Sequence, residues 1–275
     1  ISVESMRAST IGGNVNSLGI VARNGIFSGI LLMTIMRDKL VQTLSWILLL
    51  VCFAGILLSG SRTNFYGTLV IIGTIFFLGI FQSSKDKFRL IFMIMILSSI
   101  GYTAFQFVPE FVKLRLLMGG SGDSYYAESA QHRYEYTQNQ QNQALTFFLQ
   151  YPLFGVGLGR THYESGRQGG AHDTVSSIVG ETGLLGTIGF LALLIWSLRI
   201  LLKHLNDSKE LKHKIRFSLL LGMLLSMLIM GIFGGLIIPY DRSFWMTLGL
   251  IYPITRFALN MPQIRTSHTH NIALR

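Results

Sequence analysis

Long apolar runs constrain the fold of this chain more than any other feature. A helix that crosses a bilayer needs about 20 mostly apolar residues. The charged fraction, 13%, is about half of that in soluble domains. We therefore expect an all-α, polytopic membrane helix bundle with about seven transmembrane helices, at residues 17–36, 41–58, 64–82, 89–108, 174–201, 217–238 and 243–259. The first is the least certain, because Arg23 and Asn24 interrupt it.

These stretches divide the chain into three parts. Residues 1–108 hold the first four predicted transmembrane helices, residues 109–173 form a long loop, and residues 174–275 hold the last three helices and a tail. The chain begins at Ile1, and residues 1–16 lack the basic and apolar regions of a signal peptide. We therefore expect further helices before residue 1 in the full protein.

Basic residues are distributed unevenly between the two ends of these helices. The connectors 37–39, 83–89 and 198–216 and the C-terminal tail hold two, three, six and three of the 23 Lys and Arg residues. Because basic loops stay in the cytoplasm, the loop 109–173 is expected to face outward, away from the cytoplasm. The net charge of +10 is then a set of topology signals, which argues against nucleic-acid binding.

The loop 109–173 is too long for a simple connector, and loops of this length are usually functional. After a turn cluster, "MGGSGDS", a polar stretch can form an amphipathic helix from about Glu128 to Gln150. Pro152 then ends that helix, and the alternating glycines of "YPLFGVGLG" demand unusual backbone angles.

Arg62 stands in the short connector "SGSRTN" between two apolar runs. An arginine in such a turn is often an interfacial cation whose stem lies along apolar surface. A guanidinium beside the first amides of the helix 64–82, however, also suits a phosphate or diphosphate. The residues alone leave both interpretations open.

Arg133 and its aromatic neighbours Tyr134 and Tyr136 lie in the polar part of the loop, in "AQHRYEYTQ". A solvated helix face would account for Arg133, and aromatic residues in such a helix often lie on the membrane surface. The alternative is that the two tyrosines stack on sugar rings.

His172 opens the stretch "HDTVSSIVGETGLLGT". Helical spacing places it on one face with four small residues, Ser176, Gly180, Gly183 and Thr187, and such a face allows close approach to another helix. We expect the ring to point into the bundle from its outer rim. The simpler interpretation is that His172 and Asp173 only cap the next helix.

Two further charges, Arg23 and Glu181, fall inside apolar helices, two or three turns from their outer ends. Charges inside a membrane are costly and usually paired. We therefore interpret these two residues as a buried pair with either a structural or a site-lining role.

Other classes of site find little support. Cys52 is the single cysteine, and the sequence lacks a phosphate-binding loop followed by lysine, a zinc-type ligand spacing and a serine elbow. We expect neither a metal nor a cofactor. Composition alone still leaves a channel or transporter open.

Taken in order, "SGSRT", the arginine-bearing loop, "YPLFGVGLG" and "HDTVSSIVGETGLLGT" resemble the O-antigen ligase and polymerase family of bacterial membrane glycosyltransferases, over roughly residues 7–200. The ligase signature is His, then Asn, Ser or Gln, nine residues, and Gly-x-x-Gly-Thr. Here His172 is followed by Asp173, which departs from the signature, and nine residues later by Gly183.

The resemblance implies an enzyme of the bacterial inner membrane whose active site faces the periplasm. Its donor would be a glycan on undecaprenyl diphosphate, and its acceptor lipid A core for a ligase or a growing glycan for a polymerase. Arg62, Arg133 and His172 match the essential positions of the family. The transfer would be metal-independent, with arginines stabilising the diphosphate. The alternative from another class is a flippase for the same lipid.

Overall fold

The computed structural model describes residues 15–36, 38–81, 141–160, 174–232 and 241–260. Every regular element within these ranges is a helix, which confirms the all-α expectation. The elements are a short helix at 141–150, α1 (Val15–Ile35), α2 (Lys39–Ser59), α3 (Arg62–Thr74), the π-helix η2 (Ile75–Phe81), α8 (Thr174–Asp207), α9 (Leu211–Ile232) and α10 (Arg242–Asn260).

Four described helices, α1, α2, α8 and α9, are long and apolar enough to cross a membrane. The apolar helix formed by α3 and the start of η2 is shorter. The chain is thus a polytopic helical membrane protein. The predicted helix at 89–108 lies outside the described residues. α9 begins at Leu211 rather than at the predicted residue 217. The prediction left the basic stretch 211–216 in the connector, whereas the structure has it as the first turns of the helix.

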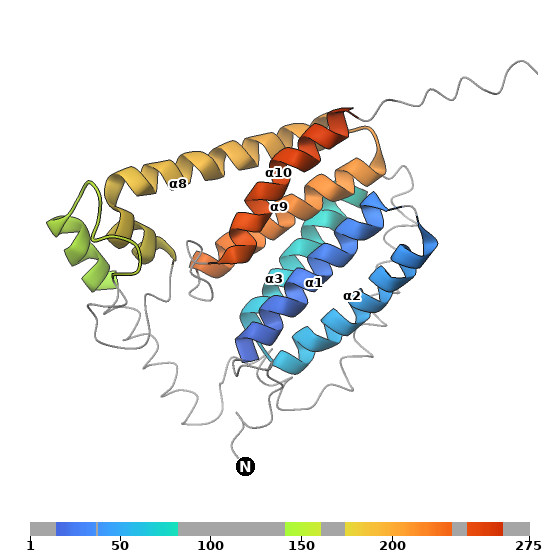
Figure 1. The fold of residues 1–275 in the computed structure, drawn as a ribbon, viewed down its shortest axis with the longest axis horizontal. Helices are drawn as coiled ribbons and strands as arrows, with labels where there is room; N and C mark the ends of the chain where they lie inside the picture. The colour runs from blue at the N-terminus through green and yellow to red at the C-terminus, as the bar shows by residue number, and fades with distance from the viewer. Residues whose placement is uncertain (1–14, 37, 82–140, 161–173, 233–240, 261–275) are drawn as a thin grey trace, which may run out of the picture.

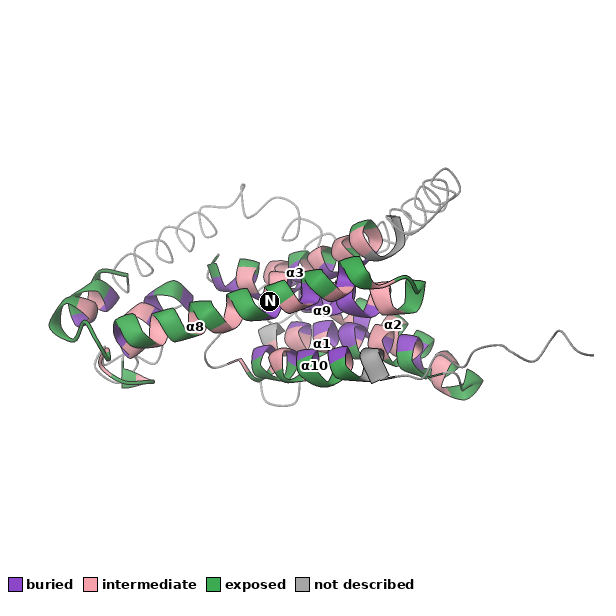
Figure 2. Ribbon diagram, turned by 90° about the horizontal axis from the view of Figure 1, so that it is seen from above, coloured by how far each residue is buried: buried purple, intermediate pink, exposed green. Residues whose placement is uncertain are grey.

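α9 lies at the centre of the bundle (Figure 1). α1 and α3 pack on one side of it, α2 packs on the far side of α1, and α8 and α10 pack on the other side of α9. Figure 2 shows that buried residues gather on α1 and α9, whereas α8 is largely exposed. In a membrane, these exposed apolar faces meet lipid.

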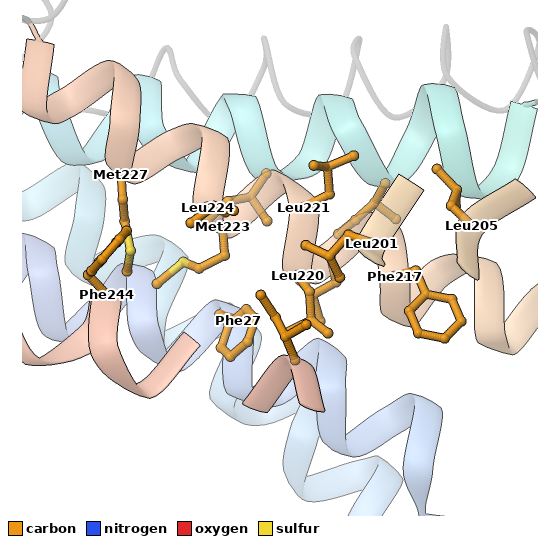
Figure 3. Close-up of a cluster of buried hydrophobic side chains, with 14 of the residues drawn as sticks. Phe27, Leu201, Leu205, Phe217, Leu220, Leu221, Met223, Leu224, Met227 and Phe244 are labelled. Atoms are coloured by element: carbon orange, nitrogen blue, oxygen red, sulfur yellow. The ribbon is translucent and has the colours of Figure 1, made fainter. Parts of the chain in front are cut away.

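The side chains of α9 are buried around its whole circumference, as expected for a helix that is apolar on all sides. Phe217, Leu220, Met223, Leu224 and Met227 form the centre of the core. They pack with side chains from three other helices (Figure 3): Phe27 of α1, Leu201 and Leu205 of α8, and Phe244 of α10.

Small residues allow α3 and α9 to approach closely. A Cβ atom at Gly222 of α9 would lie 3.1 Å from the Cα atom of Ile71, and one at Gly67 of α3 would lie 2.7 Å from the Sδ atom of Met230. Lipid tails are as apolar as leucine, so membrane helices associate mainly through such close packing. The contact fixes the start of α3 against the end of α9.

The end of α1 is held by Arg216, a buried residue in the first turns of α9. Its Nη2 atom donates a hydrogen bond to the carbonyl oxygen of Thr34, and its Nε atom donates to the Thr34 hydroxyl oxygen at 3.3 Å. The last carbonyls of a helix lack partners within the helix and carry partial negative charge. Arg216 therefore caps α1 from a neighbouring helix.

Replacing Arg216 with Met should lower the stability of the folded protein by about 1.5–3 kcal/mol, the scale of hydrogen bonds to a charged group. The reason is that the Thr34 carbonyl would lose its charged donor. The measurement is the melting temperature of the purified protein in detergent. Arg199→Met is the matched control, because Arg199 is exposed on α8. Equal melting temperatures for the two variants would show that the cap contributes nothing.

Candidate functional site

Arg62 is the first residue of α3 and is partly exposed. The turn before it is tight, because α2 ends at Ser59 and Gly60 adopts the left-handed conformation (φ 57°). The Ser59 hydroxyl donates to the Ile56 carbonyl at 2.8 Å and accepts from the Ser61 amide at 3.2 Å. Ser59 and Ser61 are both buried, so this turn fixes the backbone position of Arg62.

Ser61 is the N-cap residue of α3, yet its side chain makes no hydrogen bond to the first amides of the helix. Its hydroxyl oxygen instead accepts from the Nδ2 atom of Asn64 at 3.0 Å. Asn64 is itself buried and lies against Gly19 of α1. The N-cap side chain therefore does not bind the first amides of α3. These amides form the positive end of the helix, and Arg62 is its first residue.

Arg23 is completely buried in α1. Its Nη1 atom donates to the Sδ atom of Met230 at 2.7 Å, and Asp241 lies near enough for its charge to act on the guanidinium. The Nε and Nη2 atoms of Arg23 have no hydrogen-bond partner among the described residues. A second link, from Asn24 Nδ2 to the Ser243 hydroxyl at 2.7 Å, ties α1 to α10.

The structure therefore brings Arg23 and Arg62 to the same end of the bundle. α1, α3 and α10 begin at this end, and α9 finishes there (Figure 1). Arg23 and Arg62 together outweigh the Asp241 carboxylate that lies near Arg23, so a positive charge remains beside the first turn of α3. Such an environment favours a bound anion.

Asn64, Asp241 and Ser243 belong to this polar cluster but were not predicted from the sequence. Asp241 accepts hydrogen bonds from the amides of Ser243 at 2.6 Å and Phe244 at 3.3 Å, as an N-cap residue does. An acidic residue directly before an apolar run is a recognisable signal for such a cap. Asn64 offers no comparable signal in the sequence.

α8 contains a break that the sequence analysis did not anticipate. Gly183 has φ 61° and ψ −160°, a backbone region that is essentially restricted to glycine. The helix therefore consists of two segments, before and after Gly183, that run in different directions (Figure 1). The predicted small-residue face ends at this break, so Thr187 does not continue the stripe of Ser176 and Gly180.

The loop 151–160 closes the break with backbone hydrogen bonds. The carbonyls of Gly180 and Glu181, at the end of the first segment, accept from Val156 at 3.1 Å and from Gly157 at 2.9 Å. The amides of Leu184 and Leu185, at the start of the second segment, donate to the carbonyls of Pro152 at 2.8 Å and Leu153 at 3.1 Å. The loop thus replaces the hydrogen bonds that an unbroken helix would make with itself.

Three side-chain and packing features complete this joint, which comprises the loop 151–160 and residues 180–187 of α8. The Glu181 carboxylate is buried and accepts from the Gly159 amide at 3.1 Å. The Thr187 hydroxyl donates to the Gly183 carbonyl at 2.6 Å. Gly155 (φ 66°) approaches so closely that a Cβ atom there would lie 2.4 Å from the Glu181 carbonyl carbon.

The interpretation of Arg23 and Glu181 as a pair is not supported, because each has different partners. Arg23 contacts Met230 and lies near Asp241, whereas Glu181 binds the backbone of the loop 151–160. Both residues are buried, as expected for charges inside apolar helices. His172, Arg133, Tyr134 and Tyr136 lie outside the described residues, so their positions stay predictions.

Comparison with known proteins bears on the same residues. The family model for O-antigen ligase matches residues 47–191, a range that includes Arg62, His172 and the break at Gly183. No curated protein matches the chain. The family match covers more than half of the 275 residues. This polytopic membrane protein therefore belongs to the O-antigen ligase family.

Proposed function

We propose that this protein transfers a glycan from undecaprenyl diphosphate to lipid A core on the periplasmic face of the bacterial inner membrane. Its family consists of glycosyltransferase-like membrane enzymes, the ligases and polymerases, and implies a lipid-linked glycan and membrane-bound substrates. The apolar helices agree with a donor that is itself held in the bilayer.

The observation that carries this proposal is the position of Arg62. It combines a partly exposed guanidinium with a helix start whose N-cap side chain makes no capping bond. A diphosphate fits this combination, because helix amides and a forked guanidinium both donate hydrogen bonds to phosphate oxygens. Arg23 adds a second positive charge at the same end of the bundle.

In the proposed reaction, the acceptor hydroxyl oxygen attacks the anomeric carbon of the donor glycan while the bond from that carbon to the phosphate oxygen breaks. The electron pair passes to the diphosphate, and Arg62 and Arg133 stabilise the developing negative charge. His172 takes the proton of the acceptor hydroxyl or holds the diphosphate as an imidazolium. No metal ion is required, since the arginines supply the positive charge.

Other predicted site residues receive different roles in this proposal. Tyr134 and Tyr136 stack on sugar rings of the glycan, because an aromatic face suits the apolar face of a sugar. Arg23 acts through its charge, since it is fully buried. Glu181 holds the loop 151–160 in place rather than contacting the donor.

Replacing Arg62 with Lys should lower the transfer rate by at least about tenfold. Lysine keeps the charge but loses the forked geometry, and a lost charge-assisted hydrogen bond is worth roughly 1.5–3 kcal/mol. The measurement is the release of undecaprenyl diphosphate by purified protein supplied with lipid-linked glycan and lipid A core. Arg133→Ala should be at least as damaging.

Arg199→Lys serves as the control, because this exposed arginine lies in the second segment of α8, beyond the joint. If Arg62→Lys and Arg199→Lys both transfer glycan at the wild-type rate, Arg62 is only an interfacial cation. If the wild-type protein moves the lipid across vesicles but releases no undecaprenyl diphosphate, the protein is a flippase and the proposal fails.

Asp173 favours a second candidate within the family, a polymerase that extends the glycan. The ligase signature has Asn, Ser or Gln at this position, and this chain has Asp. A glycan gel of a strain that lacks the gene separates the two. Loss of all long chains from lipid A core indicates a ligase, whereas retention of a single capped repeat indicates a polymerase.

A further inference from the structure

Five exposed apolar side chains lie on the helix 141–150 and the loop 151–160. Phe154 is 73% exposed, Leu149 is 71% exposed and Leu158 is 68% exposed, and Leu145 and Leu153 are exposed beside them. We call these five residues the apolar edge. A contiguous apolar surface usually marks contact with a protein partner or a membrane.

The helix 141–150 is built to present this edge in one direction. Ala144 and Phe147 are buried, and Ala144 lies directly against Gly180 of α8. Leu145 and Leu149, one helical turn apart, share an exposed face. The exposed polar residues Thr146 and Gln150, also one turn apart, lie on a third face. This arrangement is typical of an amphipathic helix at a membrane surface.

The joint fixes the level of the apolar edge along α8. Pro152 and Leu153 accept hydrogen bonds from Leu184 and Leu185, the first residues of the α8 segment that crosses the bilayer. Leu184 and Leu185 are exposed, as are Ile188 and Leu191 further along the same segment. The apolar edge is therefore continuous with the lipid-facing surface of α8.

The backbone of the loop 151–160 is also prepared for an apolar environment. Irregular backbone at membrane depth needs its polar groups paired within the protein. The amides of Gly155, Val156 and Gly157 all donate to backbone carbonyls, and the Gly159 amide donates to the Glu181 carboxylate. In an aqueous loop water could satisfy these four amides, so their pairing within the protein agrees with an apolar environment.

From these observations we infer that the apolar edge is inserted among the acyl chains of the leaflet at this end of the bundle. The occupant of the surface is the lipid bilayer, and the segment 145–158 forms a wedge beside the outer end of α8. The inference requires only that α8 crosses a membrane, so it does not depend on the proposed transfer reaction. It also changes the expectation that the whole loop 109–173 lies outside the membrane, because the segment 145–158 would lie among the acyl chains.

Nitroxide labels provide the test, in the whole chain with Cys52→Ala, reconstituted in vesicles of phosphatidylethanolamine and phosphatidylglycerol. Labels are attached at Phe154→Cys and Leu158→Cys, with Leu185→Cys, an exposed position at the level of the joint, as the lipid-facing reference and Gln150→Cys as the matched control on the polar face. Their collision rates with oxygen, which dissolves in lipid, and with a water-soluble nickel complex are then compared.

We expect the ratio of the oxygen rate to the nickel rate at Phe154 and Leu158 to match that at Leu185, and the ratio at Gln150 to be clearly lower. A ratio at Phe154 and Leu158 as low as at Gln150 would place the edge in water and overturn the inference. Low rates with both reagents would mean that protein covers the edge, from a partner or a second copy, and would overturn it equally. If one variant fails to fold, the other still decides.

Discussion

Alanine in place of Gly183 should destabilise the protein by about 3 kcal/mol or more and stop glycan transfer. The backbone at Gly183 (φ 61°, ψ −160°) costs a residue with a Cβ atom about 1–3 kcal/mol. The added Cβ atom would also lie 2.5 Å from the Gly155 amide nitrogen and 2.7 Å from the Leu153 carbonyl carbon. Opening the joint would lose hydrogen bonds worth about 1 kcal/mol each.

The measurements are the melting temperature in detergent and the rate of limited proteolysis within the loop 151–160. Gly189→Ala is the matched control, because Gly189 lies in the same helix and a Cβ atom there meets no other atom within 4 Å. Alanine at that position should be neutral or slightly stabilising. If the two variants melt at the same temperature, α8 is a continuous helix and the joint does not exist.

Asparagine in place of His172 should abolish glycan transfer while leaving the amount of folded protein unchanged. A positioned acid or base contributes about 10²–10⁴-fold to a rate, and asparagine can replace neither the proton acceptor nor the imidazolium. Asparagine is, however, a good helix N-cap. The substitution therefore removes the proposed chemistry and retains any capping role beside Thr174, where α8 begins.

Variants of Asp173 complete that comparison. Asp173→Asn, which introduces a residue of the ligase signature, should be tolerated in the transfer assay. If His172 and Asp173 only cap α8, Asp173→Ala should be the harmful change, by about 1 kcal/mol of stability. A His172→Asn protein that transfers glycan at the wild-type rate would make this histidine an ordinary residue of the helix end.

Local patterns were sufficient to predict most of the helices. The apolar run at 41–58 predicted α2 to within two residues at each end, since the structure has Lys39–Ser59. The least certain helix, at 17–36, is also present as α1 (Val15–Ile35). Arg23 does not interrupt it, because Met230 of α9 and Asp241, directly before α10, accommodate the guanidinium.

The joint could be predicted only in part. The alternating glycines of the loop 151–160 were expected to need unusual backbone angles, and Gly155, Gly157 and Gly159 all have positive φ. Their partner could not be identified, because the break at Gly183 exists only through hydrogen bonds to a loop more than 20 residues earlier in the chain. Helical periodicity alone favours a continuous helix across 174–201.

The pairing of Arg23 with Glu181 was wrong for a related reason. Spacing along each helix placed both charges inside apolar helices, and their burial agrees with this. The sequence does not specify which helix faces meet, however. Two of the partners found instead, Met230 and the Gly159 amide, are a thioether and a backbone group, which carry no charge pattern to detect. The third, Asp241, lies outside the apolar helices in which a charge partner was sought.

The break in α8 also resolves a mismatch between the helix and the bilayer. α8 has 34 residues, which as a straight helix would measure about 51 Å, whereas the hydrocarbon core is about 30 Å thick. An unbroken helix would have to tilt strongly or project into water. The segment after Gly183 measures about 36 Å, so it can cross with modest tilt. The turns before Gly183 then need not cross the membrane. The loop 151–160, rather than the lipid, sets the direction in which they leave it.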